Sequence, residues 1–374
     1  MTANIGFLTY ALDRAPGGIG RYTRELLDAL RRNGLAPITL QAGRTHDDEQ
    51  AIGLPAAGLL PGLLTVGQVE IAWIARQQHL DVIHDPTGTT PLGLARARRV
   101  VTIHDVIPYI YPTASTRLDR LIYRTWLPFA LRQVDAIITV SECSKADIVR
   151  VLGVQPEQVS VIGEAANPGY RPLEAAKTQA MLQRYGINFP YILYVGSIEA
   201  RKNLVRLLEA YAHLRTWSQG WELVIVGARK WQAGPVLDTL QRLKLQEYVH
   251  LPGFVAEEAL PALYNGADLF IFPSLYEGFG LPVLEAMACG TPVVTSNTSS
   301  LPEVAGDAGL QVDPLDVEAI AQAMRRVLED ASLAADLRAR GLHRAQQFSW
   351  ERTAQETIAV YEQVLGRSVT GDSR

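Results

Sequence analysis

The stretch Glu277-Gly-Phe-Gly-Leu-Pro-Val-Leu-Glu285 decides the fold, because it joins two carboxylates through a glycine-rich turn that opens a helix. The apolar run Asp268-Leu-Phe-Ile-Phe-Pro273 precedes it and Thr291-Pro-Val-Val-Thr-Ser296 follows it, so a strand is predicted on each side. Proline suits the first helical turn and glycine suits the C-terminal cap, which predicts a helix over about residues 282–289. A strand, loop, helix and strand in this order indicate an α/β fold with a parallel sheet.

The turn is suited to bind an anionic ligand. Four backbone N–H groups point out of the predicted helix N-terminus, where the helix dipole favours a phosphate: those of Gly278, Phe279, Gly280 and Leu281. Glu277 in the loop can accept hydrogen bonds from sugar hydroxyls, and Glu285 in the helix can accept both hydroxyls of a ribose. The alternative is a capped helix without a ligand, but the Gly-Phe-Gly-Leu-Pro sequence and the flanking strands favour a sugar-nucleotide site.

The wider segment from Phe272 to Val294 resembles the signature of the retaining glycosyltransferases of family four, which have the two-domain GT-B fold. The resemblance extends over nearly the whole chain through four further motifs: Pro16-Gly-Gly-Ile-Gly-Arg-Tyr22, Thr102-Ile-His-Asp105, Thr139-Val-Ser141 and Tyr194-Val-Gly-Ser-Ile-Glu-Ala-Arg-Lys-Asn203. It implies an α/β fold of two Rossmann-like doubly wound domains that face a central cleft. The form of the last motif looks closest to bacterial mannosyltransferase-like members.

The order of the predicted elements indicates two domains. Short β-branched runs alternate with amphipathic helical stretches, and this alternation restarts after a turn-rich stretch at residues 167–172. We predict an N-terminal acceptor-side domain over residues 1–172 and a C-terminal donor-binding domain over residues 173–351. The resemblance implies that a last helix, about 352–370, packs back on the N-terminal domain. The predicted strands cover residues 4–9, 36–40, 82–84, 100–104, 136–140, 159–162, 191–195, 222–226, 249–251, 269–272, 292–295 and 309–312.

Composition excludes several classes of protein. The 374 residues carry a net charge of -4, with 35 basic and 39 acidic side chains, which gives no general electrostatic case for binding nucleic acid. The N-terminus enters a predicted strand without the features of a secretory signal. The longest uncharged run, residues 50–69, contains Pro55 and Pro61 and is a poor membrane-spanning helix. The cysteines, Cys143 and Cys289, have no disulfide or metal spacing, so a reducing cytoplasm is expected.

The loop Gly17-Gly18-Ile19-Gly20 follows the first predicted strand and precedes a helix over about residues 21–32. A glycine-rich loop at this place in an α/β domain can approach a ligand with its backbone, although the pattern is not a full dinucleotide fingerprint. A purely structural turn is the alternative. The resemblance favours contact with the donor phosphate or the acceptor.

Arg201 and Lys202 follow the first strand of the second domain, so both are expected at the carboxyl edge of its sheet, where ligands bind in open α/β sheets. Adjacent cations there suit a diphosphate, and a solvated surface pair is the alternative. The resemblance implies that they neutralise the departing nucleoside diphosphate. Ser197 stands where many family members carry a further basic residue. We keep it among the donor-binding residues, which leaves the charge compensation to Arg201, Lys202 and the helix N-terminus.

His104 is predicted to end a strand at the carboxyl edge of the first domain. The resemblance places it over the donor sugar, where it hydrogen-bonds a hydroxyl with help from Asp105; a structural histidine is the alternative. No carboxylate pair is placed as in a double-displacement glycosidase. The resemblance therefore implies same-face substitution, in which the leaving phosphate helps to deprotonate the acceptor. The candidate catalytic residues are His104, Arg201, Lys202 and Glu277, the last as a sugar-binding group and not as a proton donor.

Gly253-Phe254-Val255 resembles the segment through which such enzymes hold the nucleobase with backbone groups, and a plain β-turn is the alternative. Ser141 can cap a helix or lie near the donor. No metal is expected, because the histidines show no ligand spacing and the resembled fold handles diphosphate without a bound cation. No cofactor is expected either, since the nucleotide-sugar is a substrate.

The partners are a nucleotide-sugar donor and a glycan, glycolipid or small acceptor. GDP-mannose is the favoured donor, and UDP-linked hexoses are the alternative. The apolar stretch 57–64 and three arginines on one helical face, Arg117, Arg120 and Arg124, indicate peripheral contact with anionic lipid at the inner face of the membrane; packing within the domain is the alternative. Other hypotheses are a GT-B sugar-nucleotide epimerase, a phosphorylase and a non-catalytic nucleotide-sugar sensor.

Overall fold

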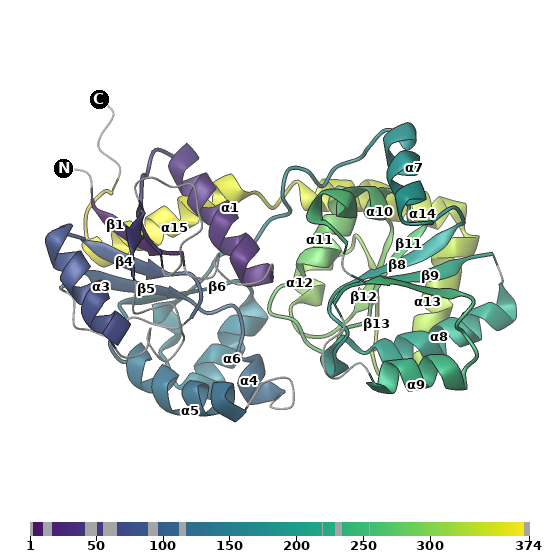
Figure 1. Ribbon diagram of the computed structural model, residues 1–374, viewed down its shortest axis with the longest axis horizontal. Coiled ribbons are helices and arrows are strands. Elements are labelled where there is room, and N and C mark those ends of the chain that lie inside the picture. The colour runs from purple at the N-terminus through teal and green to yellow at the C-terminus, as the bar shows by residue number, and fades with distance from the viewer. Residues whose placement is uncertain are drawn as a thin grey trace. The chain divides into compact units, whose positions relative to one another are not determined.

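The chain folds into two compact units (Figure 1). The computed structural model describes residues 3–9, 17–41, 51–54, 66–88, 96–111, 117–218, 220–228, 234–253 and 255–369. The first unit joins Met1–Glu164 to Ser349–Arg374, and the second is Ala165–Phe348. The boundaries predicted after residues 172 and 351 lie eight and three residues beyond these positions.

The first unit is built on a seven-stranded parallel sheet. Its strand order is β3-β2-β1-β4-β5-β6-β7, so the direction of winding reverses between β1 and β4. All strands predicted for this half are present with ends within about two residues, whereas β3 was not predicted because two residues are too few to form a pattern. The strands are β1 (Ile5–Leu8), β2 (Ile38–Gln41), β3 (Ile52–Gly53), β4 (Val82–Asp85), β5 (Arg98–Thr102), β6 (Ala136–Thr139) and β7 (Val159–Val161).

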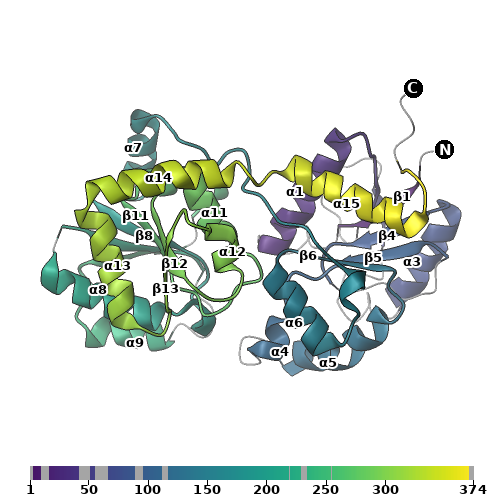
Figure 2. The same ribbon diagram turned by 180° about the vertical axis from the view of Figure 1, so that it is seen from behind.

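Helices cover both faces of the first sheet (Figure 2). On one face lie α1 (Gly18–Arg32) and α15 (Trp350–Leu365), and on the other lie α3 (Val66–Gln77), α5 (Arg117–Leu131) and α6 (Glu142–Leu152). A short helix, α4 (Ile107–Ile110), precedes α5. The last helix is tied to this unit because Thr353 Oγ1 donates to the carbonyl oxygen of Gly163 at 2.7 Å and Arg32 Nε donates to Glu351 at 3.2 Å.

Helix α1 begins earlier than predicted. Gly18 and Gly20 lie in its first turn, and only Gly17 precedes it, as an N-cap with extended backbone. Glycine is a weak helix former because its backbone loses more conformational freedom in a helix than that of other residues. The helix forms because one of its faces, which includes Tyr22 and Leu26, is fully buried. The prediction of a loop is therefore wrong from Gly18 onward.

The second unit is a six-stranded parallel sheet of order β10-β9-β8-β11-β12-β13, which reverses its winding between β8 and β11. All of its predicted strands are present, again within about two residues at each end. The strands are β8 (Tyr191–Val195), β9 (Glu222–Val226), β10 (Val249–Gly253), β11 (Leu269–Phe272), β12 (Val293–Ser296) and β13 (Leu310–Val312).

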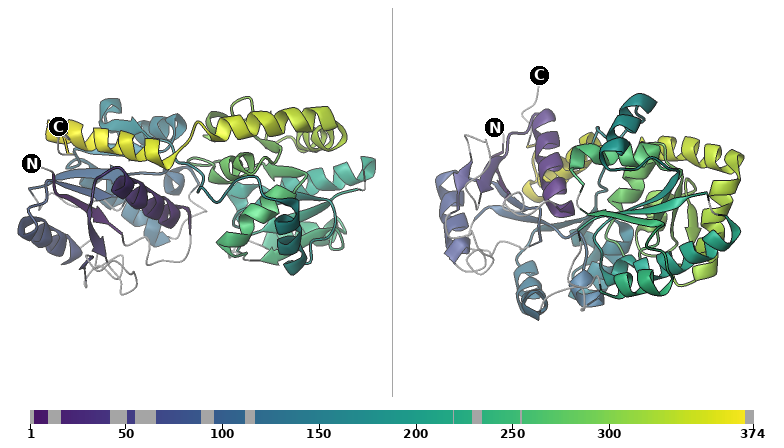
Figure 3. Two further views of the ribbon diagram at one scale, coloured as in Figure 1. Left: turned by 90° about the horizontal axis from the view of Figure 1, so that it is seen from above. Right: turned by 45° about the vertical axis from the view of Figure 1, so that its right-hand side comes forward.

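The second sheet is also covered on both faces, as the views of Figure 3 show. One face carries α8 (Leu204–Trp217), α9 (Gly234–Arg242) and α13 (Val317–Glu329), and the other carries α10 (Leu260–Gly266), α11 (Leu281–Ala288) and α12 (Leu301–Ala305). Helix α7 (Ala175–Arg184) packs on α10, and α14 (Ala331–Ala345) packs on α11. Helix α11 is therefore enclosed between the sheet and α14.

The outer surfaces of α3 and α5 expose large apolar side chains. On α3, Val69 and Trp73 are 60% and 63% exposed, and on α5, Leu121 and Phe129 are 60% and 52% exposed. Exposed apolar side chains that gather on one surface often mark a contact site. Throughout the part of the chain that the structure describes, no helix has both the length and the apolar character needed to cross a membrane.

A chain of buried hydrogen bonds joins α15 to the first sheet. The hydroxyl of Tyr361 lies 2.6 Å from Nδ1 of His84, and Nε2 of the same ring lies 2.8 Å from Oγ1 of Thr102. Burial lowers the pKa of His84 to about 3, and the charge of His104 acts in the same direction. The ring is therefore neutral, and a neutral imidazole needs one acceptor and one donor, which the two hydroxyls supply.

Tyr361→Phe tests this chain of hydrogen bonds. The substitution leaves Nδ1 of a fully buried histidine without a partner, which costs about 1–3 kcal/mol. We expect a lower melting temperature by circular dichroism. Tyr185→Phe, at the partly exposed end of α7, is the control and should change stability by less than about 0.5 kcal/mol. If Tyr361→Phe is as stable as the wild type, the hydrogen bond between Tyr361 and His84 does not stabilise the fold.

Candidate active site

Three charged side chains form a buried cluster at the carboxyl edge of the second sheet. Oε1 of Glu277 lies 2.5 Å from Nζ of Lys202, and Oε2 lies 2.8 Å from Nη1 of Arg201. Glu277 follows β11 and the two cations follow β8, so they flank the point at which the winding reverses. Ligands bind outside the carboxyl ends of the strands at such points. The structure thus joins two sequence motifs into one site.

The segment after β8 fixes the two cations. It forms a single 3-10 turn, Ala200–Lys202, which ends at Asn203 with a φ of 62°. The side-chain amide of Asn203 donates to the carbonyl oxygens of Pro273 at 3.1 Å and Pro314 at 2.6 Å. Because Pro273 follows β11, these bonds hold the turn against the segment that leads to Glu277.

Each cation has further contacts. Arg201 donates to the carbonyl oxygen of Tyr276 at 2.9 Å and forms a second ion pair, also at 2.9 Å, with Glu199. The ammonium of Lys202 lies 4.8 Å from the ring centroid of Phe272, within the range of a cation–π contact. Sequence reasoning predicted two cations that are available to a diphosphate. In the structure both are already paired with carboxylates.

The cluster keeps Glu277 ionised. Burial opposes its charge, but the charges of Lys202 and Arg201 and the hydrogen bond from Lys202 outweigh burial and lower the pKa of Glu277 to about 2. Glu277 and Lys202 are only 8% and 7% exposed, so water screens their interaction weakly. Glu277 therefore acts as a hydrogen-bond acceptor at neutral pH and not as a proton donor.

The glycine-rich turn leads directly into α11. Gly280 is its N-cap with a φ of 115°, and a Cβ atom there would lie 2.7 Å from a methyl group of Leu301, so the position requires glycine. Among the described residues, no hydrogen bond uses the backbone N–H of Phe279, Gly280 or Leu281. These groups are oriented at a helix N-terminus, the arrangement that binds anions.

Two serines that follow β12 hold this turn in place. Oγ of Ser299 accepts the backbone N–H of Glu277 at 3.1 Å, and Oγ of Ser300 lies 3.0 Å from the carbonyl oxygen of Glu277 and 2.6 Å from that of Phe279. Sequence reasoning missed both. Their position at the carboxyl end of a strand next to β11 was the available signal.

Glu285 lies in α11, as predicted, and is buried. The hydroxyl of Tyr264, from α10, donates to its Oε2 at 2.9 Å. The helix ends at Ala288, and Gly290, with a φ of 76°, donates to the carbonyl oxygen of Met287 at 3.0 Å. The helix is thus confirmed within about one residue, with glycine just beyond its end. The role of Glu285 toward a ribose stays a prediction.

His104 lies at the carboxyl edge of the first sheet, in the loop after β5. The strand ends at Thr102, two residues before its predicted end, so His104 lies in the loop and not in the strand. Nδ1 lies 3.1 Å from Oε1 of Glu164, and Nε2 lies 3.0 Å from the carbonyl oxygen of Pro86. The ring of Tyr22 meets it edge-on with centroids 4.6 Å apart.

These partners determine the charge of His104. A carbonyl oxygen only accepts hydrogen bonds, so Nε2 carries a proton, and the carboxylate beside Nδ1 favours a second proton there. Burial lowers the pKa of His104, but the hydrogen bond and charge of Glu164, the bond to Pro86 and the charge of Asp105 raise it overall. The carboxylate of Asp105 accepts the N–H of Ile107 at 2.9 Å and so acts on the ring through its charge. A hydrogen bond from the ring to a sugar hydroxyl would have to replace one of its present two.

Ser197 and the segment 253–255 are the remaining predicted donor-binding residues, and those that the structure describes form no hydrogen bond to the charged cluster. Ser197 donates to Oε1 of Glu199 at 3.1 Å and so reaches the cluster indirectly. Gly253 is the last residue of β10 and not part of a following turn, because the strand is longer than predicted; its carbonyl oxygen accepts the N–H of Gly227 at 3.0 Å. Val255 is buried, and Phe254 lies outside the described residues.

Ser141 is the N-cap of α6, where its hydroxyl oxygen accepts the N–H of Ser144 at 3.0 Å. The cysteines Cys143 and Cys289 are both free thiols. Within the described ranges, no three histidine, cysteine, aspartate or glutamate side chains gather closely enough to hold a metal ion.

Comparison with known proteins identifies the family. A sequence model of glycosyltransferase family 4 matches residues 16–169, and one of the glycosyl transferases group 1 matches residues 180–344. O-antigen chain mannosyltransferase B of Escherichia coli is 38% identical over 294 residues, which are 78% of this chain and 76% of that protein. The chain belongs to glycosyltransferase family 4. Its activity is therefore that of a glycosyltransferase.

Other members of the family and of its fold are also similar. The MMP α-(1→4)-mannosyltransferase of Mycolicibacterium hassiacum is 33% identical over 310 residues, which are 78% of this chain and 72% of that protein. The structure of sucrose-phosphate synthase from Thermosynechococcus elongatus has a TM-score of 0.78 at 25% identity and covers 97% of this chain and 99% of its own. Anabaena HepE, solved with UDP and glucose, has a TM-score of 0.80 at 19% identity and covers 96% and 100%. These structures confirm the predicted GT-B fold.

Glu277→Gln tests the buried cluster through the pH dependence of stability. The folded pKa of Glu277 is about 2, below its ordinary value of 4.5, so its ion pairs stabilise the protein above pH 4.5 and stop doing so as the pH falls toward 2. We expect the variant to be about 3–5 kcal/mol less stable near pH 7. This deficit should shrink below pH 4.5. Denaturant unfolding at several pH values measures it, with exposed Glu258→Gln as the control. A deficit that is the same at pH 3 and pH 7 would contradict the assignment.

Glu164→Gln tests the state of His104. The pKa of His104 is raised above 6.5, so the stabilisation by its imidazolium is complete below pH 6.5 and is lost as the pH rises through the folded value. We expect imidazole ¹⁵N NMR to find His104 charged and His84 neutral at pH 6.5. In Glu164→Gln the pKa of His104 should fall, because a neutral amide replaces the carboxylate. An unchanged pKa of His104 in this variant would show that Glu164 does not stabilise the charged imidazole.

Proposed function

We propose that the chain is a retaining mannosyltransferase that moves mannose from GDP-mannose to a hydroxyl of a glycan, glycolipid or small acceptor. The observation that carries this proposal is the pairing of Glu277 with Arg201 and Lys202 beside three N–H groups of the α11 N-terminus that have no acceptor among the described residues. A sugar diphosphate needs cations and amides for its phosphates and an acceptor for its hydroxyls. The names of the two mannosyltransferase relatives support mannose as the sugar.

Donor binding exchanges the partners within this cluster. The diphosphate takes the hydrogen bonds of Arg201 and Lys202 that Glu277 now holds, and Glu277 then accepts hydrogen bonds from sugar hydroxyls. The charges are already positioned in a site with little water, so little reorganisation is needed when the leaving group forms. Glu285 holds the ribose, and the buried Tyr264 hydroxyl keeps its carboxylate oriented.

The reaction proceeds by same-face substitution without a protein nucleophile. The departing phosphate oxygen accepts the acceptor proton as the bond to the anomeric carbon breaks. The cations and amides stabilise the charge on the diphosphate, and no metal ion or cofactor is required in this proposal. His104 contacts the donor sugar after exchanging one of its present hydrogen bonds.

A UDP-linked hexose is the second candidate donor. The structure of Anabaena HepE with UDP and glucose favours it, since that protein shares the fold over nearly its whole length. The donors differ in the nucleobase, whose expected contacts include Gly253 and Phe254. A panel of GDP-mannose, GDP, UDP-glucose and UDP, measured by thermal shift, separates the two candidates.

The acceptor reaches the protein at the cytoplasmic face of a membrane in this proposal. The support comes from α5, where exposed Leu121 and Phe129 accompany the exposed Arg124, the pattern of a surface that contacts anionic lipid. Two parts of the sequence hypothesis, the stretch 57–64 and the side chains of Arg117 and Arg120, lie outside the described residues.

Lys202→Met tests the proposed role of the cluster. The change keeps an apolar side chain but removes the charge that would stabilise the leaving diphosphate, so kcat/KM for donor cleavage should fall by about 100-fold or more. GDP release from GDP-mannose, with and without acceptor, is the measurement, and a melting curve checks that the variant is folded. Lys177→Met, on the exposed side of α7, is the control. Activity of Lys202→Met within about threefold of the wild type would overturn the proposal.

A further inference from the structure

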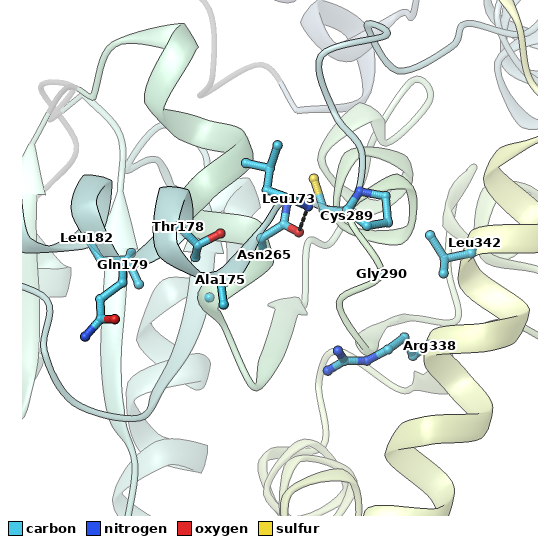
Figure 4. Close-up of a pocket in the computed structure, with 12 residues that line it drawn as sticks. Leu173, Ala175, Thr178, Gln179, Leu182, Asn265, Cys289, Gly290, Arg338 and Leu342 are labelled. Atoms are coloured by element: carbon cyan, nitrogen blue, oxygen red, sulfur yellow. Dashed lines mark hydrogen bonds between the residues drawn. The ribbon is translucent and has the colours of Figure 1, made fainter.

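A pocket separate from the candidate active site lies in the second unit, at the end of α11 opposite the glycine-rich turn (Figure 4). Its volume is about 480 Å³, which is within the range of small-molecule sites. Figure 4 shows Thr178 and Leu182 of α7 on one side and Arg338 and Leu342 of α14 on the other, with Gly290 between the two helices. The pocket is therefore enclosed by α7, α14 and the C-terminal ends of α10 and α11.

The polar side chains that line this pocket are those of Thr178, Gln179, Asn265, Cys289 and Arg338, and they differ in their partners. Asn265 is fully engaged, because its Oδ1 accepts the N–H of Leu173 at 2.8 Å and its Nδ2 donates to the carbonyl oxygens of Arg171 and Pro261. Arg338, in contrast, forms no ion pair or hydrogen bond among the described residues, and its charge acts on the carboxylate of Asp268 only as a weaker interaction. The hydroxyl of Thr178 is buried and also has no partner there.

A buried hydroxyl without a hydrogen-bond partner is unfavourable, and a ligand oxygen in the pocket would supply that partner. Arg338 supplies a cation and a planar set of donors, which match a phosphate or carboxylate. The remaining wall is apolar and includes Leu173, Leu182 and Leu342. The thiol of Cys289 contributes no charge, because burial raises its pKa.

We propose that this pocket binds a small amphipathic anion, with its anionic group on Arg338, an oxygen atom on the Thr178 hydroxyl and its apolar body against the leucines. Nothing in the assigned family activity requires this second site. The class of this ligand follows from the pocket wall, in which Arg338, a cation without an ion pair among the described residues, lies beside an apolar surface.

The pocket is connected to Glu285 by two short routes. Asn265 and Gly266 of α10 line the pocket, and Tyr264, the preceding residue, donates to Glu285. Helix α11 spans about 12 Å from the glycine-rich turn to Gly290, which lines the pocket. Thr291 joins both routes, because its hydroxyl donates to the carbonyl oxygen of Tyr264 at 2.6 Å. A ligand in the pocket therefore changes the affinity of the donor site; this part of the proposal rests on the proposed function.

Isothermal titration of the full chain with hexyl phosphate tests the binding site. We expect binding with a Kd of about 1 mM or tighter, and at least tenfold weaker binding of 1-hexanol, which lacks the anion, and of inorganic phosphate, which lacks the apolar body. Absence of binding, or equal binding of inorganic phosphate, would overturn the proposal.

Two variants locate the bound anion. Arg338→Gln should weaken the binding of hexyl phosphate about tenfold or more, because it removes the cation that holds the phosphate. The variant should still fold, since Arg338 is exposed and forms no ion pair among the described residues. Thr178→Val keeps the shape of the side chain and should also weaken binding. Arg326→Gln, an exposed arginine on α13 outside the pocket, is the matched control and should bind like the wild type. Unchanged binding by Arg338→Gln would overturn the assignment.

The coupling is tested by titrating GDP with and without saturating hexyl phosphate. We expect the Kd of GDP to change about threefold or more, and the Kd of hexyl phosphate to change by the same factor when GDP is saturating, as linkage requires. Equal GDP affinities would overturn the coupling. If GDP does not bind at all, the proposed GDP-linked donor is wrong. The hexyl phosphate titration still tests whether the pocket binds an amphipathic anion.

Discussion

A carboxylate can stay ionised inside a protein only if cations reach it, and Glu277 meets this condition through Lys202 and Arg201. The rest of the site depends on that requirement. It demands that the segments after β8 and β11 lie side by side, which the parallel order of the second sheet provides. It also demands that both segments be held in one conformation, and Asn203 and the two serines after β12 do this through hydrogen bonds to backbone atoms.

The need to pair opposite charges also explains how the protein holds two adjacent cations, Arg201 and Lys202, away from water when no donor is bound. Lysine and arginine side chains in a site with little water would repel each other if they had no counter-ion. Glu277 and Glu199 supply the counter-charges within the protein. In the proposed function, an arriving diphosphate replaces interactions that already exist, so the cations need not be ordered at the moment of binding. The cost is that the donor competes with Glu277, which favours a ligand whose sugar offers Glu277 new hydrogen-bond donors.

The sequence predicted the strands well because each is a short apolar run bounded by turn residues, a pattern that the parallel sheets of both units produce. It predicted α11 and its terminal glycine for the same local reasons. It failed where a partner lies far along the chain. The pairing of Glu277 with residues about 75 positions earlier, the serines that fix its backbone and the hydrogen bond from Tyr264 to Glu285 are contacts that only the folded sheet creates. The start of α1 was missed for another reason: glycine is a weak helix former, but the buried face after it decides the helix.

Two histidines of the first unit, the buried His84 and the half-buried His104, show why residue type and position do not suffice to predict a histidine's pKa. His84 lies in β4 and His104 just after β5, and a sequence pattern does not distinguish them. His84 has two hydroxyl partners, which can donate or accept, so its ring stays neutral and burial lowers its pKa. His104 has a carboxylate and a carbonyl oxygen as partners, and these favour the charged ring and raise its pKa in spite of burial. The partner that makes this difference, Glu164, lies 60 residues beyond His104 at the end of the first unit's main segment. The opposite pKa shifts of the two histidines are thus a property of the fold, because they depend on partners that the local sequence does not contain.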